Sequence, residues 1–190
     1  PVICSEDWTI PRHLETFGRL AEELKGAADT CVVSFLDRYR KIEKKLDQLG
    51  LRPPDSRERE EFLRAAARMA AAAGMELETC SEEGDYPSLG VRQGSCISGE
   101  RIEKITGRRV TAAKDKTQRP SCGCVKSVDI GMYDTCAHGC VYCYASRSRE
   151  LIGKNMGLAR PDSPYLSGEP DGREKITERD MPSVLGEPVR

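Results

Sequence analysis

The chain has 190 residues, of which 38% are hydrophobic and 32% charged, with 30 basic side chains against 31 acidic ones. This length suits one domain, or one domain with a tail. The net charge of −1 gives no electrostatic reason to expect a nucleic acid or an anionic membrane as a partner. The sequence has no apolar run near the ~20 residues that span a bilayer and no signal peptide at its start, which predicts a soluble cytoplasmic protein.

The first half of the chain alternates between predicted strands and helices. Apolar periodicity and flanking Gly and Pro residues predict helices over residues 9–26, 37–49 and 55–73. Short apolar runs predict strands over residues 2–4, 31–36 and 75–79. The run at 31–36 is typical of a strand that is buried on both faces. Strands and helices in this order indicate βα units on a parallel sheet.

The second half is less regular. The sequence predicts a loop over 81–95, a helix over 97–106 that Gly107 ends, a polar connector over 111–120, a fourth strand over 125–130 and a helix over 141–151. Beyond residue 159, prolines, glycines and mixed charges predict an irregular or disordered tail.

We therefore expect an α/β fold: a partial (βα) barrel-like parallel sheet with a cysteine-rich C-terminal metal-binding region and an irregular tail. The expected boundaries are 1–79 for the half barrel, 80–158 for the cysteine-rich region and 159–190 for the tail. About four strands are too few to close a barrel. Because an apolar run begins directly after Pro1, we expect that the chain continues upstream, or that a partner chain completes the barrel.

Nine cysteines are the most informative feature of the composition, and five of them lie within 22 consecutive positions. In a reducing compartment, such a cluster indicates metal or iron–sulfur ligation rather than disulfides. Cys136, Cys140 and Cys143 have the spacing Cys-x3-Cys-x2-Cys. Three thiolates at this spacing can each bind a different iron of a [4Fe–4S] cluster and leave the fourth iron open, and Gly139 allows the tight turn between them.

A structural zinc site is the alternative for these three cysteines. Zinc prefers four ligands, usually two Cys-x2-Cys pairs, and only Cys140 and Cys143 form such a pair. Cys122 and Cys124 would have to complete the site. The sequence therefore favours iron–sulfur over zinc.

Residues 136–143 resemble the signature of radical S-adenosylmethionine enzymes, with the aromatic Tyr142 before the third cysteine. The wider stretch, with Cys-Gly-Cys at 122–124 and residues 127–133 and 136–145, is similar to an uncharacterised bacterial family. That family is a domain of unknown function whose C-terminal cysteine cluster resembles the radical S-adenosylmethionine site. The motif lies about three quarters along this chain rather than near its start, so a barrel of that type would be permuted or incomplete.

The resemblance implies a mechanism and a set of ligands. Cys136, Cys140 and Cys143 would hold a [4Fe–4S] cluster, S-adenosylmethionine would bind its open iron, and Tyr142 would lie near the adenine. Reduction of the cluster would release a 5′-deoxyadenosyl radical that acts on an unknown substrate. The alternative function is a non-catalytic protein with a structural iron–sulfur or zinc site, or an electron-transfer module.

The remaining cysteines and several polar residues carry open alternatives. Four further cysteines have three open alternatives: a second cluster, a structural zinc, or no metal. They are Cys80, Cys96, Cys122 and Cys124. Cys4 and Cys31 are predicted to be buried small hydrophobic residues. Asp129 either holds S-adenosylmethionine or substrate, or caps the following turn. His138 is predicted to face solvent. A basic group is expected to meet an anionic substrate or an electron donor such as flavodoxin or ferredoxin; it comprises Lys114, Lys116, Arg119 and Lys126.

Overall fold

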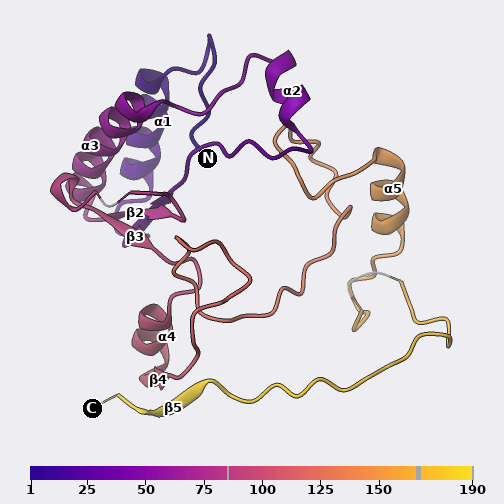
Figure 1. The fold of residues 1–190 in the computed structure, drawn as a ribbon. Helices are drawn as coiled ribbons and strands as arrows, with labels where there is room; N and C mark the ends of the chain where they lie inside the picture. The colour runs from indigo at the N-terminus through magenta and orange to yellow at the C-terminus, as the bar shows by residue number, and fades with distance from the viewer. Residues whose placement is uncertain (85, 166–167, 190) are drawn as a thin grey trace. The chain divides into compact units, whose positions relative to one another are not determined.

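A computed structural model describes residues 1–84, 86–165 and 168–189 and divides them between two compact units (Figure 1). The first unit contains residues 1–38, 47–127 and 184–189, and the second contains residues 39–46 and 128–183. The loop predicted over 81–95 and the tail predicted over 159–190 include positions 85, 166, 167 and 190, which lie outside the described residues.

A three-stranded parallel sheet is the centre of the first unit. Its strands lie in the order β1-β2-β3 and are β1 Thr30–Val33, β2 Glu76–Cys80 and β3 Val91–Gly94. The register aligns Cys31, Leu77 and Val91 in one row, whose side chains face the core. The α/β class and the parallel sheet are therefore confirmed. The three strands form an open sheet and do not close a barrel.

Two long helices cover one face of this sheet, α1 Ile10–Glu23 and α3 Ser56–Ala72, and they lie side by side (Figure 1). An apolar core fills the space between them and the sheet. Phe62 packs edge-on between Phe17 and Phe35, at ring-centroid distances of 6.1 and 6.3 Å. Both helices were expected from their apolar periodicity, and this packing is what stabilises them.

The N-terminus of α3 is fixed by a reciprocal pair of hydrogen bonds. The Asp55 carboxylate accepts the Glu58 N–H at 2.8 Å, and the Glu58 carboxylate accepts the Asp55 N–H at 2.8 Å. Arg52 donates both guanidinium nitrogens to the same Glu58 carboxylate, at 2.6 and 2.7 Å. These bonds satisfy donors that the first helical turn leaves without intrahelical partners.

The other face of the sheet is polar, so the prediction that residues 31–36 are buried on both faces is wrong. Val32 is 45% exposed because α1 and α3 both pack on the opposite side. Its register neighbours are Glu78 and Arg92. Glu78 is paired with Arg101, at 3.3 Å, from α4 Gly99–Thr106. An apolar run predicts a buried strand, but it does not show how many layers cover the strand.

Several other local predictions are corrected by the structure. The run at 2–4 forms only isolated bridges, from Val2 to Phe35 and from Cys4 to Arg52. The helix expected over 37–49 is limited to α2 Glu43–Gln48. The loop expected over 81–95 contains η1 Pro87–Leu89 and strand β3. Strand β3 has only one buried apolar side chain, that of Val91, so its composition gave little strand signal.

Two predictions in the last third of the chain are also wrong. Residues 125–130 form no strand, and only Val125 makes an isolated bridge, with Lys114. The helix expected over 141–151 is instead α5 Arg149–Gly157, because the Ser148 side chain caps it by accepting the Leu151 N–H at 3.1 Å. The tail is mostly irregular, but β5 Leu185–Pro188 pairs with β4 Arg108–Val110. None of the helices in the described ranges is long and apolar enough to cross a membrane.

Candidate metal centres

Three of the predicted metal ligands lie in the second unit, on a loop that comprises residues 135–146 and is called the cysteine loop below. Cys136 and Cys140 are exposed and Cys143 is half-buried. The loop turns at Gly139, whose φ of +66° is in the left-handed region that glycine adopts without strain. The Cys143 N–H then donates to the Cys140 carbonyl at 3.1 Å. The cysteine loop therefore presents its thiols at the surface.

Asp134 closes the base of the cysteine loop, and its side chain is 0% exposed. Its carboxylate accepts the Arg147 N–H and, at 2.7 Å, the Arg147 Nε–H. Its own N–H donates to the Ala145 carbonyl at 3.0 Å, and Asn155 of α5 donates its side-chain amide to the Asp134 carbonyl at 3.2 Å. The hydrogen bonds from Arg147 lower the pKa of Asp134. Asp134 thus joins the two ends of the cysteine loop and attaches them to α5.

The surroundings of Cys143 favour its thiolate form. Cys143 Sγ lies 3.3 Å from the Ser146 hydroxyl, which, with backbone N–H groups of residues 145 and 146, lowers the pKa of the thiol. Lys41 adds positive charge from the same unit and donates to the Tyr144 carbonyl at 2.7 Å. A thiolate is the form that binds a metal.

Aromatic side chains gather beside the cysteine loop. The ring of Tyr39 lies 6.1 Å from that of Tyr142 and 5.4 Å from that of Tyr144. The sequence pattern placed Tyr39 on a helix, but it precedes α2, and its proximity to the cysteine loop is a feature that sequence reasoning missed. No local signal could have linked residues about 100 positions apart.

Two further predicted residues lie near this loop in the chain. Asp129 is exposed, and its carboxylate accepts the Gly131 N–H at 2.7 Å, which is the turn-capping alternative. A role for Asp129 in cofactor binding stays a prediction. His138 is exposed on the cysteine loop.

The other four cysteines lie in the first unit and are called the four-cysteine group: Cys80, Cys96, Cys122 and Cys124. Cys80 ends β2, and Cys96 follows β3 by two residues. Parallel strands bring both to the carboxyl edge of the sheet, where α/β proteins place their sites. Cys80 Sγ lies 3.5 Å from Cys96 Sγ. Cys122 and Cys124 lie two positions apart on one loop.

The segment that carries Cys122 and Cys124 is attached to both strand ends. The Ser121 hydroxyl donates to the Ser81 carbonyl at 3.1 Å, and the Gln93 side-chain amide donates to the Ser121 carbonyl. The Ile97 N–H donates to Cys124 Sγ at 3.3 Å. Burial, the contact with Cys96 and the neighbouring Cys122 and Cys124 together raise the pKa of Cys80 to about 11. All four thiols therefore lie at one corner of the unit.

As the side chains stand, residues 1–84, 86–165 and 168–189 contain no group of three or more His, Cys, Asp or Glu side chains arranged to hold a metal ion. The donor chemistry nevertheless fits metal binding in both places. The cysteine loop offers three accessible thiols, and the four-cysteine group offers two adjacent pairs. Cys4, in contrast, is buried in the apolar core, as expected, whereas Cys31 is only half-buried and packs against that core.

Two members of the basic group make an ion pair or a hydrogen bond within the first unit. Arg119 pairs with Asp37 at 2.8 Å, and Lys114 donates to the Arg119 carbonyl at 3.1 Å. Its role in meeting an electron donor stays a prediction.

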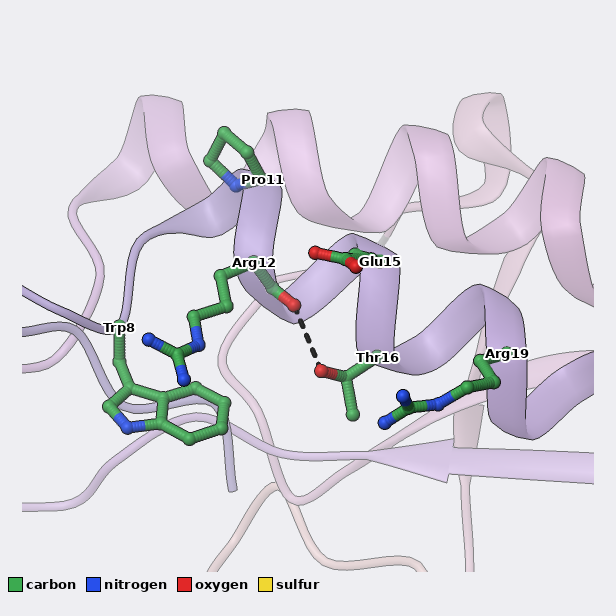
Figure 2. A pocket seen from close by; sticks show the side chains of 6 residues that line it. All are labelled: Trp8, Pro11, Arg12, Glu15, Thr16 and Arg19. Carbon is green, nitrogen blue, oxygen red and sulfur yellow. Dashed lines mark hydrogen bonds between the residues drawn. The ribbon is translucent and has the colours of Figure 1, made fainter.

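A surface hollow of about 590 Å³ lies on the outer side of α1 and contains none of the predicted site residues. Figure 2 shows Arg12 across the face of Trp8, at 4.5 Å, and the Thr16 hydroxyl donating to the Arg12 carbonyl. Both acidic and basic side chains line it, and nothing in this arrangement selects a ligand. The candidate chemistry therefore lies with the cysteines.

Comparison with known families gives one match: the model for a domain of unknown function, DUF1848, matches residues 1–145. The matched stretch includes all nine cysteines. No curated protein and no solved structure matches the chain.

Proposed function

We propose that this chain, which belongs to the DUF1848 family, is an iron–sulfur protein of the radical S-adenosylmethionine type. Cys136, Cys140 and Cys143 hold a [4Fe–4S] cluster, and the fourth iron is left for the cofactor. When bound, the cluster and S-adenosylmethionine supply a 5′-deoxyadenosyl radical, which abstracts hydrogen from a substrate of unknown class.

The observation that supports this proposal best is the cysteine loop itself. Its base is fixed by the buried Asp134, whereas its three thiols stay at or near the surface. A structural zinc site would need a fourth ligand, and three cysteines with one histidine are a set that zinc takes. Among the described residues of this unit, His138 on the same loop is the histidine that would supply it.

The surrounding residues have separate roles in this proposal. Ser146 and Lys41 favour the thiolate form of Cys143, and Asp134 holds the loop ends together. Tyr142, with Tyr39 beside it, offers an aromatic surface on which the adenine ring can stack. The small electron donor that reduces the cluster is a flavodoxin or a ferredoxin.

An anaerobic cleavage assay tests the proposal. The chain is purified without oxygen, its absorbance is recorded near ~400 nm, where iron–sulfur clusters absorb, and 5′-deoxyadenosine is measured after adding S-adenosylmethionine and dithionite. The wild-type chain is expected to form 5′-deoxyadenosine, and Cys140→Ala is expected to form at least tenfold less. Cys31→Ala is the matched control, because Cys31 lies in the other unit, half-buried against its core, and belongs to neither set of candidate ligands.

The outcomes separate the candidate functions. A cluster without cleavage, in both the wild type and the control, would contradict the enzyme and leave a structural or electron-transfer role. A colourless protein with stoichiometric zinc would contradict the iron–sulfur assignment altogether. Full cleavage by Cys140→Ala would show that this thiol is not a cluster ligand.

A further inference from the structure

The four-cysteine group offers a second metal site that the proposed function does not use. Its thiols come from three chain segments, the ends of β2 and β3 and the loop at 121–125. Hydrogen bonds join these segments beside the cysteines, from Ser121 to Ser81, from Gln93 to Ser121, and in both directions between Ile97 and the loop, at Cys124 and Val125. Each contact involves a cysteine or lies within three residues of one.

We propose that Cys80, Cys96, Cys122 and Cys124 bind a single tetrahedral metal ion, Zn²⁺, that fastens the 121–125 loop to the carboxyl edge of the sheet. Four thiolates from separate segments are a ligand set that zinc takes in structural sites. The ion adds a link to a loop that backbone hydrogen bonds already hold, among them Val125 N–H to the Ile97 carbonyl and Asp115 N–H to the Cys124 carbonyl, both at 3.0 Å.

The spacing of the sulfur atoms selects one ion over a cluster. Two thiolates on one tetrahedral zinc, each at about 2.3 Å, lie about 3.8 Å from each other. Cys80 Sγ and Cys96 Sγ are 3.5 Å apart, close to that spacing. In a [4Fe–4S] cluster each thiolate binds a different iron, so the sulfur atoms lie much farther apart.

Local geometry around Cys124 also suits a bound thiolate. The Ile97 N–H points to Cys124 Sγ at 3.3 Å, and such bonds orient and stabilise metal thiolates. Cys124 is 9% exposed, so a thiolate there needs a positive partner. Gly123 lies between the two cysteines and is packed so closely on Ser95 that a Cβ atom would overlap the Ser95 hydroxyl. As they stand, the four side chains do not form a site, so the proposal requires that they move together when the ion binds.

Metal analysis of the full chain tests this inference. The wild type, Cys96→Ser and the control Cys31→Ala are expressed with both zinc and iron in the medium, and zinc, iron and acid-labile sulfide are measured per chain. Cys96 is exposed, so its replacement leaves the apolar core intact. We expect about one zinc in the wild type and control, at least tenfold less in Cys96→Ser, and unchanged iron and sulfide. Circular dichroism confirms that each variant is folded.

A second measurement uses Co²⁺ as the probe. In the metal-free Cys140→Ala background, whose cysteine loop lacks one ligand, Co²⁺ is expected to give the intense visible bands of a tetrahedral thiolate site, and adding Cys96→Ser is expected to remove them.

Three results would overturn the inference. Loss of sulfide together with iron in Cys96→Ser would show that the group holds a cluster. A Cys80–Cys96 disulfide found by mass spectrometry in metal-free, reduced-purified protein would assign the pair to redox chemistry. Equal zinc in all three proteins would place zinc elsewhere. Because the readout is zinc, failure here is distinct from failure of the cysteine loop to bind iron.

Discussion

Gly123→Ala is the most informative single substitution next to the four-cysteine group. An added Cβ atom would overlap the Ser95 hydroxyl, whereas its next neighbours, the Gly94 carbonyl and Ser95 Cβ, are both 3.6 Å away. The steric conflict therefore comes from one oxygen atom. Overpacking of a core costs about 1–3 kcal/mol. Because Gly123 is exposed and the Ser95 hydroxyl can turn aside by rotation of its side chain, we expect Gly123→Ala to lower the free energy of unfolding by about 1 kcal/mol, the lower end of that range.

A double-mutant cycle isolates this contact. Ser95→Ala removes the oxygen that the new methyl group would overlap. The single Ser95→Ala change should alter stability by less than about 0.5 kcal/mol. In the double variant the new methyl group meets only atoms at ordinary contact distance, so most of the stability is expected to return.

Urea unfolding of the four proteins, with a metal chelator present throughout, measures the coupling between the two positions. The predicted coupling is about 1 kcal/mol, opposite in sign to the cost of Gly123→Ala. Additive effects, with no recovery in the double variant, would refute the close packing of Gly123 on Ser95 and the docked position of the 121–125 loop.

Three further predictions concern the rest of the chain. Asp134→Ala should increase the opening of the cysteine loop roughly tenfold or more, because the Arg147 N–H and Nε–H lose the fully buried acceptor that joins the two ends of the loop. Hydrogen exchange of the Ala145–Arg147 amides measures this, and exchange no faster than in Asp180→Ala would contradict it. Leu63→Ala, at a 0% exposed position of α3, should cost about 2–5 kcal/mol, whereas Ile176→Ala, 81% exposed, should have no measurable effect on the unfolding midpoint. Hydrogen bonds from Arg52 and from the Asp55 N–H lower the pKa of Glu58 to about 2 from 4.5. The stabilisation by the Glu58 carboxylate is therefore present above about pH 4.5 and is lost as the pH falls through 2. Glu58→Gln should flatten this part of the acid unfolding curve, and an unchanged curve would show that Glu58 does not stabilise the fold.

The helices and strands that the sequence predicts correctly are those with a signal in their own residues, such as an N-cap or an apolar run. The helix α3 has an acidic N-cap, a Glu three residues later and a long alanine-rich stretch, and β2 is a short run that ends at Cys80. Strand β3 has one buried apolar residue, so only its pairing with β2 reveals it. The start of α5 depends on Ser148, and the preceding segment, which looks helical in sequence, is held in turns through Asp134.

The sequence predicts the candidate ligand residues, but it does not predict the contacts that hold their loops in place. Spacing identified Cys136, Cys140 and Cys143, and the cysteine count identified the four-cysteine group. The supports are contacts between residues distant in the sequence: Ser121 with Ser81, 40 positions apart, and Lys41 with the Tyr144 carbonyl, 103 positions apart. Such contacts follow from tertiary packing and leave no periodic or spacing signal.

The cysteine loop is proposed to hold an iron–sulfur cluster, and measuring iron and acid-labile sulfide per chain tests this assignment. In the anaerobically purified chain we expect about four iron and four sulfide per chain at this site. Both should be lost in Cys140→Ala and retained in Cys96→Ser and Cys31→Ala. Iron and sulfide that are unchanged in Cys140→Ala, or absent from the wild type, would contradict it.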